Sequence, residues 1–216
     1  MLQGGNFLIT TYNKPALGDT LIVVLAQDTA EETTKQANGI TGIYDAQGEA
    51  IGFNFFDVAR FTPVEGQGQV HLTVDQIKEL NQAIVAAGLT GALPLAETPK
   101  FVIGKIIDFQ PHPKSDHLHV TQVDFGTHQE QIVCGAPNAA LGQTVVAALP
   151  GAMMPDGKII WPGELLGVPS FGMLCAAREL AIPGAPAARG ILIMPDDLAA
   201  GSEFDFKQAE AVVAAS

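Results

Sequence analysis

Residues 167–180 read Gly-Val-Pro-Ser-Phe-Gly-Met-Leu-Cys-Ala-Ala-Arg-Glu-Leu, and residues 132–138 read Ile-Val-Cys-Gly-Ala-Pro-Asn. A third segment, Pro-His-Pro-Lys-Ser-Asp-His-Leu, occupies residues 111–118. The three segments combine short apolar runs with glycine or proline, which is typical of short strands joined by tight turns. None of them forms a catalytic constellation. The pattern therefore predicts a small β-barrel in the second half of the chain.

The composition permits one large domain or two small ones. The chain has 216 residues, of which 47% are hydrophobic and 16% are charged, so it can bury a core. The formal net charge of −12 means that the average surface repels phosphate. Because nucleic-acid affinity depends on clustered Lys and Arg, this charge argues against a strong general nucleic-acid binder.

The two cysteines, Cys134 and Cys175, lie outside any Cys-x-x-Cys or Cys/His zinc spacing. We interpret them as buried, reduced thiols of a cytoplasmic protein. The first residues, Met-Leu-Gln-Gly-Gly-Asn, do not follow the pattern of a signal peptide. No unbroken apolar run has the length of a membrane span, so we expect no membrane partner.

The first half predicts a β-rich α+β domain with one helix over residues 1–90. Thr73 and Gln76 form a Thr-x-x-Gln capping box, and Gly88 follows the apolar helical repeat as a C-terminal cap. The Ala-Gln-Gly sequence at 46–48 suggests a hairpin loop. Runs rich in β-branched and aromatic residues predict strands at 6–13, 20–27, 40–45 and 49–57.

Residues 91–100 contain glycine and proline without periodicity, which predicts a linker between two domains. A second β domain is expected over 101–206, followed by a tail at 207–216 that could be a frayed helix or disordered. The fold class is thus mainly β with short helices. Within the second domain we expect strands at 101–109, 118–125, 131–133 and 144–149, and shorter ones near 158–160, 172–174 and 191–193.

Further motifs accompany the three opening segments. Residues 102–105 read Val-Ile-Gly-Lys and residues 123–126 read Val-Asp-Phe-Gly. In this order, the motifs closely resemble the tRNA-binding domain of bacterial phenylalanyl-tRNA synthetase β chains, which also occurs in stand-alone tRNA-binding proteins. The resemblance implies an OB-fold barrel over 101–206. With its additional N-terminal domain, the whole chain is similar to the YtpR-type tRNA-binding proteins.

The resemblance implies non-catalytic binding of tRNA. OB barrels bind nucleic acid across one strand face framed by two loops. Bases stack there on aromatic side chains or Arg planes, while Lys and Arg follow the phosphates. On this basis the candidate contacts are Lys105, Lys114, His117, His119, Asn138, Ser170, Phe171 and Arg178. Of these, Asn138, Ser170 and Arg178 are expected to face outward from the barrel scaffold. Arg178 could instead pair with an acidic neighbour.

The chain departs from the family where many members carry basic residues. A Lys-x-Arg-Gly sequence usually precedes the Val-x-Ser-x-Gly-Met stretch, but here residues 164–167 read Glu-Leu-Leu-Gly. The family's Asp-Lys-Leu is likewise Asp-His-Leu at 116–118. Each lost phosphate contact lowers affinity and flattens the salt dependence. The alternative function is therefore a protein-interaction adaptor that keeps the barrel but binds RNA weakly or not at all.

Other functions receive little support from the sequence. There is no phosphate-binding loop and no dinucleotide fingerprint, so we expect no cofactor. The spacing of His112, Asp116, His117 and His119 does not fit a zinc site, so we expect no metal. Isolated His and Asp residues are the only argument for an enzyme, and we expect none. The sequence does not decide whether the protein forms a homodimer. An exposed strand edge would be the physical cause of one.

Overall fold

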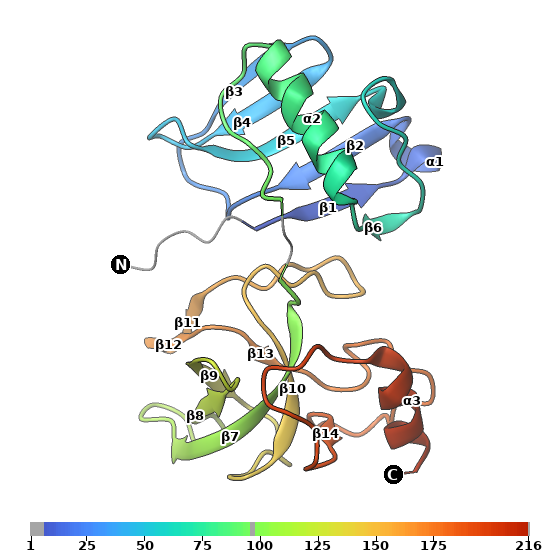
Figure 1. Ribbon diagram of the computed structural model, residues 1–216. Helices are drawn as coiled ribbons and strands as arrows, with labels where there is room; N and C mark the ends of the chain where they lie inside the picture. The colour runs from blue at the N-terminus through green and yellow to red at the C-terminus, as the bar shows by residue number, and fades with distance from the viewer. Residues whose placement is uncertain (1–6, 96–97, 216) are drawn as a thin grey trace. The chain divides into compact units, whose positions relative to one another are not determined.

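The computed structural model describes residues 7–95 and 98–215. The chain divides into two compact units, Met1–Thr98 and Pro99–Ser216. Both are built mainly from antiparallel strands (Figure 1). Each unit has its own buried hydrophobic cluster, so each is described by itself.

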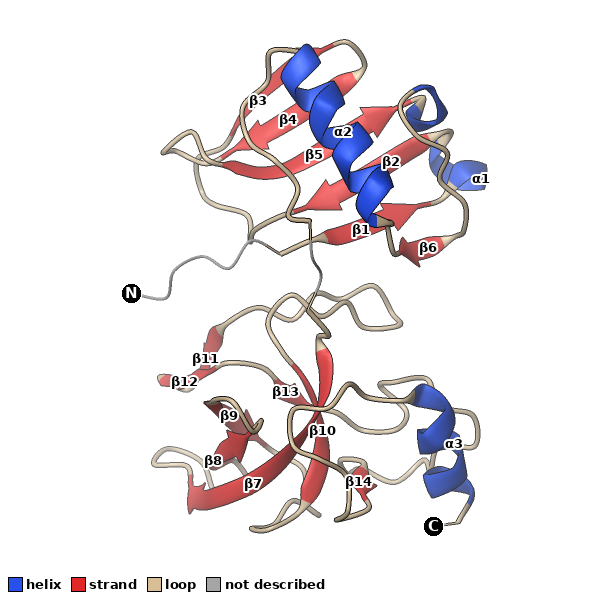
Figure 2. Cartoon of the chain, viewed as in Figure 1, coloured by secondary structure: helices blue, strands red, loops and turns tan. Residues whose placement is uncertain are grey.

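The N-terminal unit is one six-stranded antiparallel sheet in the order β3-β4-β5-β2-β1-β6. Figure 2 shows helix α2 lying across one face of this sheet. The elements are β1 (Ile9–Tyr12), α1 (Lys14–Leu17), β2 (Thr20–Val24), β3 (Thr33–Ala37), β4 (Ile40–Tyr44), β5 (Ala50–Phe56), η1 (Val58–Arg60), β6 (Gly68–Val70) and α2 (Val74–Ala86).

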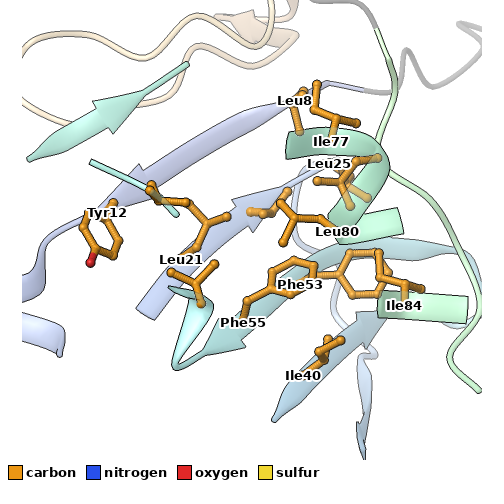
Figure 3. Close-up of a cluster of buried hydrophobic side chains, with 14 of the residues drawn as sticks. Leu8, Tyr12, Leu21, Leu25, Ile40, Phe53, Phe55, Ile77, Leu80 and Ile84 are labelled. Atoms are coloured by element: carbon orange, nitrogen blue, oxygen red, sulfur yellow. The ribbon is translucent and has the colours of Figure 1, made fainter. Parts of the chain in front are cut away.

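Alternation along the strands builds the core beneath α2. Leu21 of β2 and Phe53 and Phe55 of β5 point toward the helix, which presents Leu80 and Ile84 to them (Figure 3). Such alternation turns every second residue of a strand to the same face. The predicted capping box is confirmed: Gln76 N–H donates to Thr73 Oγ1 at 3.3 Å, and Thr73 N–H donates to Gln76 Oε1 at 2.8 Å.

Two features of this unit differ from the sequence-based expectation. Strands β3 and β6 were not expected, because β3 is an edge strand of largely exposed polar residues without apolar alternation. The proposed linker also begins too early. Leu93 is buried, and its N–H donates to Asn81 Oδ1 of α2 at 2.7 Å. The chain up to Leu93 therefore packs as part of the N-terminal core.

The C-terminal unit is a small barrel with an added helix. Its main sheet has the order β13-β10-β7-β8-β9, and β14 pairs with β10. The elements are β7 (Phe101–Pro111), β8 (His119–Asp124), β9 (Gln129–Cys134), β10 (Thr144–Ala148), β11 (Gly163–Leu165), β12 (Val168–Ser170), β13 (Met173–Leu174), β14 (Ile193–Met194) and α3 (Phe206–Ala214).

Contacts between β9 and the segment that enters β13 close the barrel. Phe171 N–H donates to the Gln131 carbonyl oxygen at 2.8 Å, and Gln131 Nε2 donates to the Pro169 carbonyl oxygen at 2.6 Å. The cyclic order is therefore β7-β8-β9-β13-β10, in which β7 pairs with β8 on one side and with β10 on the other. This is the five-stranded, partly open barrel of the OB fold.

Strand β10 is buried on both faces. Val145 and Ala147 belong to the cluster inside the barrel, whereas Val146 and Ala148 belong to a second cluster outside it. The second cluster includes Ala209 and Val213 of α3, which are buried. Of the two interpretations left open for 207–216, a frayed helix or a disordered tail, the structure shows a helix: residues up to 214 belong to α3, which packs on the outer face of β10.

Two expectations about short strands also need correction. Residues 158–160 were expected to form a strand, but they contribute only an isolated bridge between Met153 and Ile159. The hairpin of β11 and β12 was not expected. Its residues are too few to show an alternating pattern, and β11 is exposed along its whole length.

Candidate nucleic-acid interface

The outer face of β7, β8 and β9 is the surface on which an OB barrel commonly holds nucleic acid. Thr121 and Val123 of β8 are fully buried, so their neighbour Gln122 points outward. Gln122 lies opposite Asp108 and Gln131 in the sheet. Lys105 is the only Lys or Arg on the three strands. This face offers amides and carboxylates to a ligand but little positive charge.

Lys105 already has an acidic partner. Its Nζ lies 3.6 Å from Asp196 Oδ1, which also accepts a hydrogen bond from Thr144 Oγ1 at 2.9 Å. Both charged side chains are largely exposed, so the pair adds little stability. Asp196 nevertheless neutralises the charge of Lys105, which the sequence analysis proposed as an RNA contact on this face.

His112 joins the loop at residues 112–118 to the hairpin of β11 and β12. Lys114 N–H donates to His112 Nδ1 at 3.1 Å, so the proton of the neutral ring sits on Nε2, which lies 3.0 Å from the Leu165 carbonyl oxygen. The ring is buried. Lys114 is exposed, and its Nζ lies next to Gly167. The loop lysine and the segment that departs from the family therefore meet at one place.

Ser115, Asp116 and His117 lie together on the same loop but do not form a relay. Ser115 Oγ and Asp116 Oδ1 lie 3.2 and 3.1 Å from the same atom, His117 Nδ1. A catalytic triad instead needs the two partners on opposite ring nitrogens. The hydrogen bond from His117 lowers the pKa of the exposed Asp116 carboxyl. Within residues 7–95 and 98–215, no three His, Cys, Asp or Glu side chains gather as metal ligands.

Two predicted contacts lie in or near the barrel interior. Ser170 is buried: its Oγ accepts a hydrogen bond from Val133 N–H at 3.0 Å and donates to the Gly172 carbonyl oxygen at 3.3 Å. The expectation that Ser170 faces outward is therefore wrong, because this hydroxyl helps to close the barrel. His119 is half-buried and stacks on Phe109, with ring centroids 4.3 Å apart.

Asn138 and Arg178 are exposed, but both bind backbone groups of the segment at 188–191. Asn138 Nδ2 donates to the Ile191 carbonyl oxygen at 3.0 Å, and Ile191 N–H donates to Asn138 Oδ1 at 2.8 Å. Arg178 Nη1 donates to the Ala188 carbonyl oxygen at 3.2 Å. Among the described residues, no carboxylate forms an ion pair with Arg178. The alternative expectation, that Arg178 pairs with an acidic neighbour, is therefore wrong.

A hollow of about 250 Å³ lies between the loop at 134–138 and the segment at 188–191. Arg178 and Arg189 both line it. The sequence analysis missed Arg189, since a single cation in the Ala-Pro-Ala-Ala-Arg-Gly segment carries no motif. Arg189 becomes a candidate contact only because the fold places it on the same hollow as Arg178.

The two cysteines are free and buried, as the sequence predicted. Burial raises the pKa of Cys175 to about 12, and the nearby Glu179 carboxylate adds to the shift. Burial also raises the pKa of Cys134. Both groups are therefore neutral thiols at physiological pH, which makes them poor nucleophiles.

Each of the two units matches a known protein-family model. The family model described as "Putative tRNA binding domain" matches residues 101–203, and the "Domain of unknown function (DUF4479)" matches residues 27–95. The putative tRNA-binding protein YtpR of Bacillus subtilis is 40% identical over 197 residues, which are 90% of this chain and 98% of that protein.

Synthetase subunits match the C-terminal unit. The phenylalanine–tRNA ligase β subunit of Thiobacillus denitrificans is 44% identical over 129 residues, which are 58% of this chain but only 16% of that subunit. The crystal structure of a MetRS related protein from Pyrococcus horikoshii covers 48% of this chain at 18% identity, with a TM-score of 0.37. In the part of the chain that the structure describes, no helix is both long and apolar enough to cross a membrane.

Proposed function

The chain belongs to the YtpR family of tRNA-binding proteins, and we propose that it binds tRNA through its C-terminal barrel without catalysing a reaction. The observation that carries the proposal is the 40% identity to a relative of which the chain covers 98%. The synthetase subunits are matched over at most about a sixth of their length, so no aminoacylation activity is transferred from them. Two further observations argue against covalent catalysis. The cysteine thiols are protonated, and Ser115 and Asp116 share one nitrogen of His117 instead of forming a relay through the ring.

The proposed contact set is smaller than the sequence suggested. Lys114 and His117 are exposed on the loop at 112–118, Phe171 is half-buried beside β9, and Arg178 lines the hollow. We assign them to RNA. Ser170, Asn138, His119 and Lys105 form contacts within the protein, so we propose that they support the binding surface instead.

A filter-binding experiment with bulk tRNA tests the proposal. Retention at about 50 mM salt should fall by at least tenfold at about 200 mM, because several phosphate contacts release counterions. Lys114→Gln should weaken binding by about threefold and flatten the log–log salt slope by about 0.9. Lys105→Gln is the matched control, since Asp196 already neutralises that lysine. Absence of retention at low salt, or retention that ignores salt, would overturn the proposal.

The adaptor function is the alternative, and one observation favours it. The outer face of β7 to β9 presents Asp108 with neighbouring amides, which suits a protein partner better than phosphate. It becomes the preferred function if the wild-type chain retains no tRNA. If tRNA binding holds, we propose that the protein acts in the cytoplasm and in trans, as a tRNA chaperone or as a partner of a synthetase. Sedimentation of the chain with and without tRNA would test the homodimer.

A further inference from the structure

The hollow lined by Arg178 and Arg189 adjoins a second, larger one. The second has a volume of about 530 Å³ and reaches Lys158 on the turn between Met153 and Ile159. Met173, Arg178 and Glu179 line both hollows, so the two lie side by side along these three residues. We call the two hollows together the arginine groove and define its charged residues as Arg189, Arg178, Lys158, Glu179 and Asp156.

The arginine groove reverses the charge balance of its surroundings. It holds three cations and two carboxylates, whereas residues 100–216 as a whole carry seven cations and twelve carboxylates. The two carboxylates also bind backbone N–H groups: Glu179 accepts from Ala176 at 2.8 Å and Asp156 from Lys158 at 3.0 Å. Among described residues, none of the three cations has an ion-pair partner. Their positive charges are therefore not neutralised by an ion pair and can attract a ligand's phosphates.

The protein holds the Arg178 side chain and the backbone on both sides of Arg189 in position before any ligand binds. The Arg178 guanidinium is tied to the Ala188 carbonyl oxygen, next to Arg189. Asn138 fixes Ile191, two residues after Arg189, through both ends of its amide. Such preorganisation lowers the entropy cost of binding.

We propose that the arginine groove binds a single-stranded segment of RNA, with its phosphates along Arg189, Arg178 and Lys158. The inference rests on the proposed function and names the form of RNA that this part of the barrel accepts. The groove reaches the end of β9 at Val133 and Cys134 and offers cations that are unpaired among the described residues, whereas the one lysine on the outer face of β7 to β9 is already paired with Asp196.

The shape of the groove favours an unpaired strand over a duplex. Its walls include the apolar side chains of Met154, Pro155, Met173 and Leu174 beside the cations. An unpaired base can enter such a recess and contact apolar walls or a guanidinium plane. In an RNA double helix the bases are stacked inside and present only their edges in the grooves, so no base could enter the recess.

Fluorescence anisotropy with the full chain tests this inference. The probes are a labelled oligouridylate of about six nucleotides, a double-stranded RNA of matched phosphate number, and bulk tRNA as competitor. Arg189→Gln and Lys158→Gln should each weaken oligouridylate binding by about three- to tenfold, and each should flatten the salt slope by about 0.7. Lys207→Gln on α3 removes the same charge outside the groove and should change affinity by less than about twofold.

The outcomes separate this inference from the proposed function. If tRNA binds but the oligouridylate does not, or if the groove variants behave like Lys207→Gln, the groove is not the site and tRNA binding stands. If the duplex binds as tightly as the oligouridylate and loses as much in the variants, the preference for single strands is wrong. If the oligouridylate binds but the filter assay retains no tRNA at low salt, the groove inference holds while the proposed function fails.

Discussion

The side-chain amide of Asn138 pairs with both backbone groups of Ile191, at 3.0 Å through Nδ2 and 2.8 Å through Oδ1. This contact links the loop that follows β9 to the segment that carries Arg189. Asn138→Asp keeps the acceptor but places a carboxylate oxygen against the Ile191 carbonyl. We expect a loss of about 1–3 kcal/mol from the C-terminal unit, the cost of an unmade hydrogen bond that faces an acceptor.

Urea unfolding followed by tryptophan fluorescence measures this loss, because the chain has a single tryptophan, Trp161, in the C-terminal unit. Asn54→Asp on β5 of the other unit is the control and should leave the Trp161 transition unchanged. Equal midpoints for Asn138→Asp and the wild type would contradict a structural role. The variant should also bind the oligouridylate more weakly, since the segment carrying Arg189 loses its anchor.

Glu164 offers a test of the family's lost basic residues. It is exposed on β11, and His112 connects this hairpin to the loop of Lys114 through the Leu165 carbonyl oxygen. Glu164→Lys should strengthen tRNA binding by about three- to tenfold at low salt and steepen the salt slope by about 0.9. Filter binding at several salt concentrations measures both.

The control for this gain is Glu210→Lys on α3, which makes the same change of charge on a distant side of the unit (Figure 1). It should raise affinity less, because screening removes interactions beyond a Debye length of about 10 Å. An equal gain in the two variants would mean that net charge alone, and not the hairpin, sets the affinity.

The sequence predicts regular elements best where a local pattern repeats. The capping box and the apolar repeat identify α2, and the long apolar runs identify β7 and β10. It fails where the decisive partner is remote in the chain. Ser170 is polar and follows Pro169, yet it is buried because Val133 N–H, 37 residues earlier, needs an acceptor. Nothing near residue 170 carries that information.

The helix α3 and the arginine groove illustrate the same limit. The nine residues of α3 bury only Ala209 and Val213, which is too short an apolar repeat to separate a packed helix from a frayed tail. Arg178 and Arg189 lie in different turns, and neither belongs to a basic cluster in the sequence. Their meeting depends on the fold that brings the segment at 188–191 beside the loop at 134–138.

Cys175 should be unreactive in the folded chain. Burial, with a contribution from Glu179, raises the pKa of its thiol from 9.0 to about 12. Iodoacetamide at about pH 8 should therefore leave Cys175 unmodified in the native protein and alkylate it in urea, because the thiolate is the nucleophile. Mass spectrometry after both treatments measures the difference. Rapid native alkylation of Cys175 would contradict its burial.

The same shift makes stability depend on pH in the alkaline range. A thiol whose pKa is raised on folding binds its proton more tightly in the folded state. Its contribution to stability is complete below the unfolded value of 9.0 and is lost as the pH rises from there toward about 12. The urea concentration at the midpoint of the Trp161 transition should accordingly decrease as the pH rises from 9.0 toward about 12. In Cys175→Ala, which is less stable at every pH, the midpoint should decrease by a smaller amount over the same range.

Gly172 stands at the point where the barrel closes. Its φ is +140°, and a Cβ built there would lie 2.8 Å from the Ala148 carbonyl oxygen of β10. Gly172→Ala should destabilise the C-terminal unit by about 2–4 kcal/mol, because the obstacle is backbone and cannot rotate away. Gly142→Ala is the matched control: its φ of +84° is also unfavourable for alanine, but no atom lies within 4 Å of the added Cβ. That variant should lose about 1 kcal/mol, the conformational cost alone. If urea unfolding gives equal losses for the two variants, the close contact with Ala148 does not constrain residue 172.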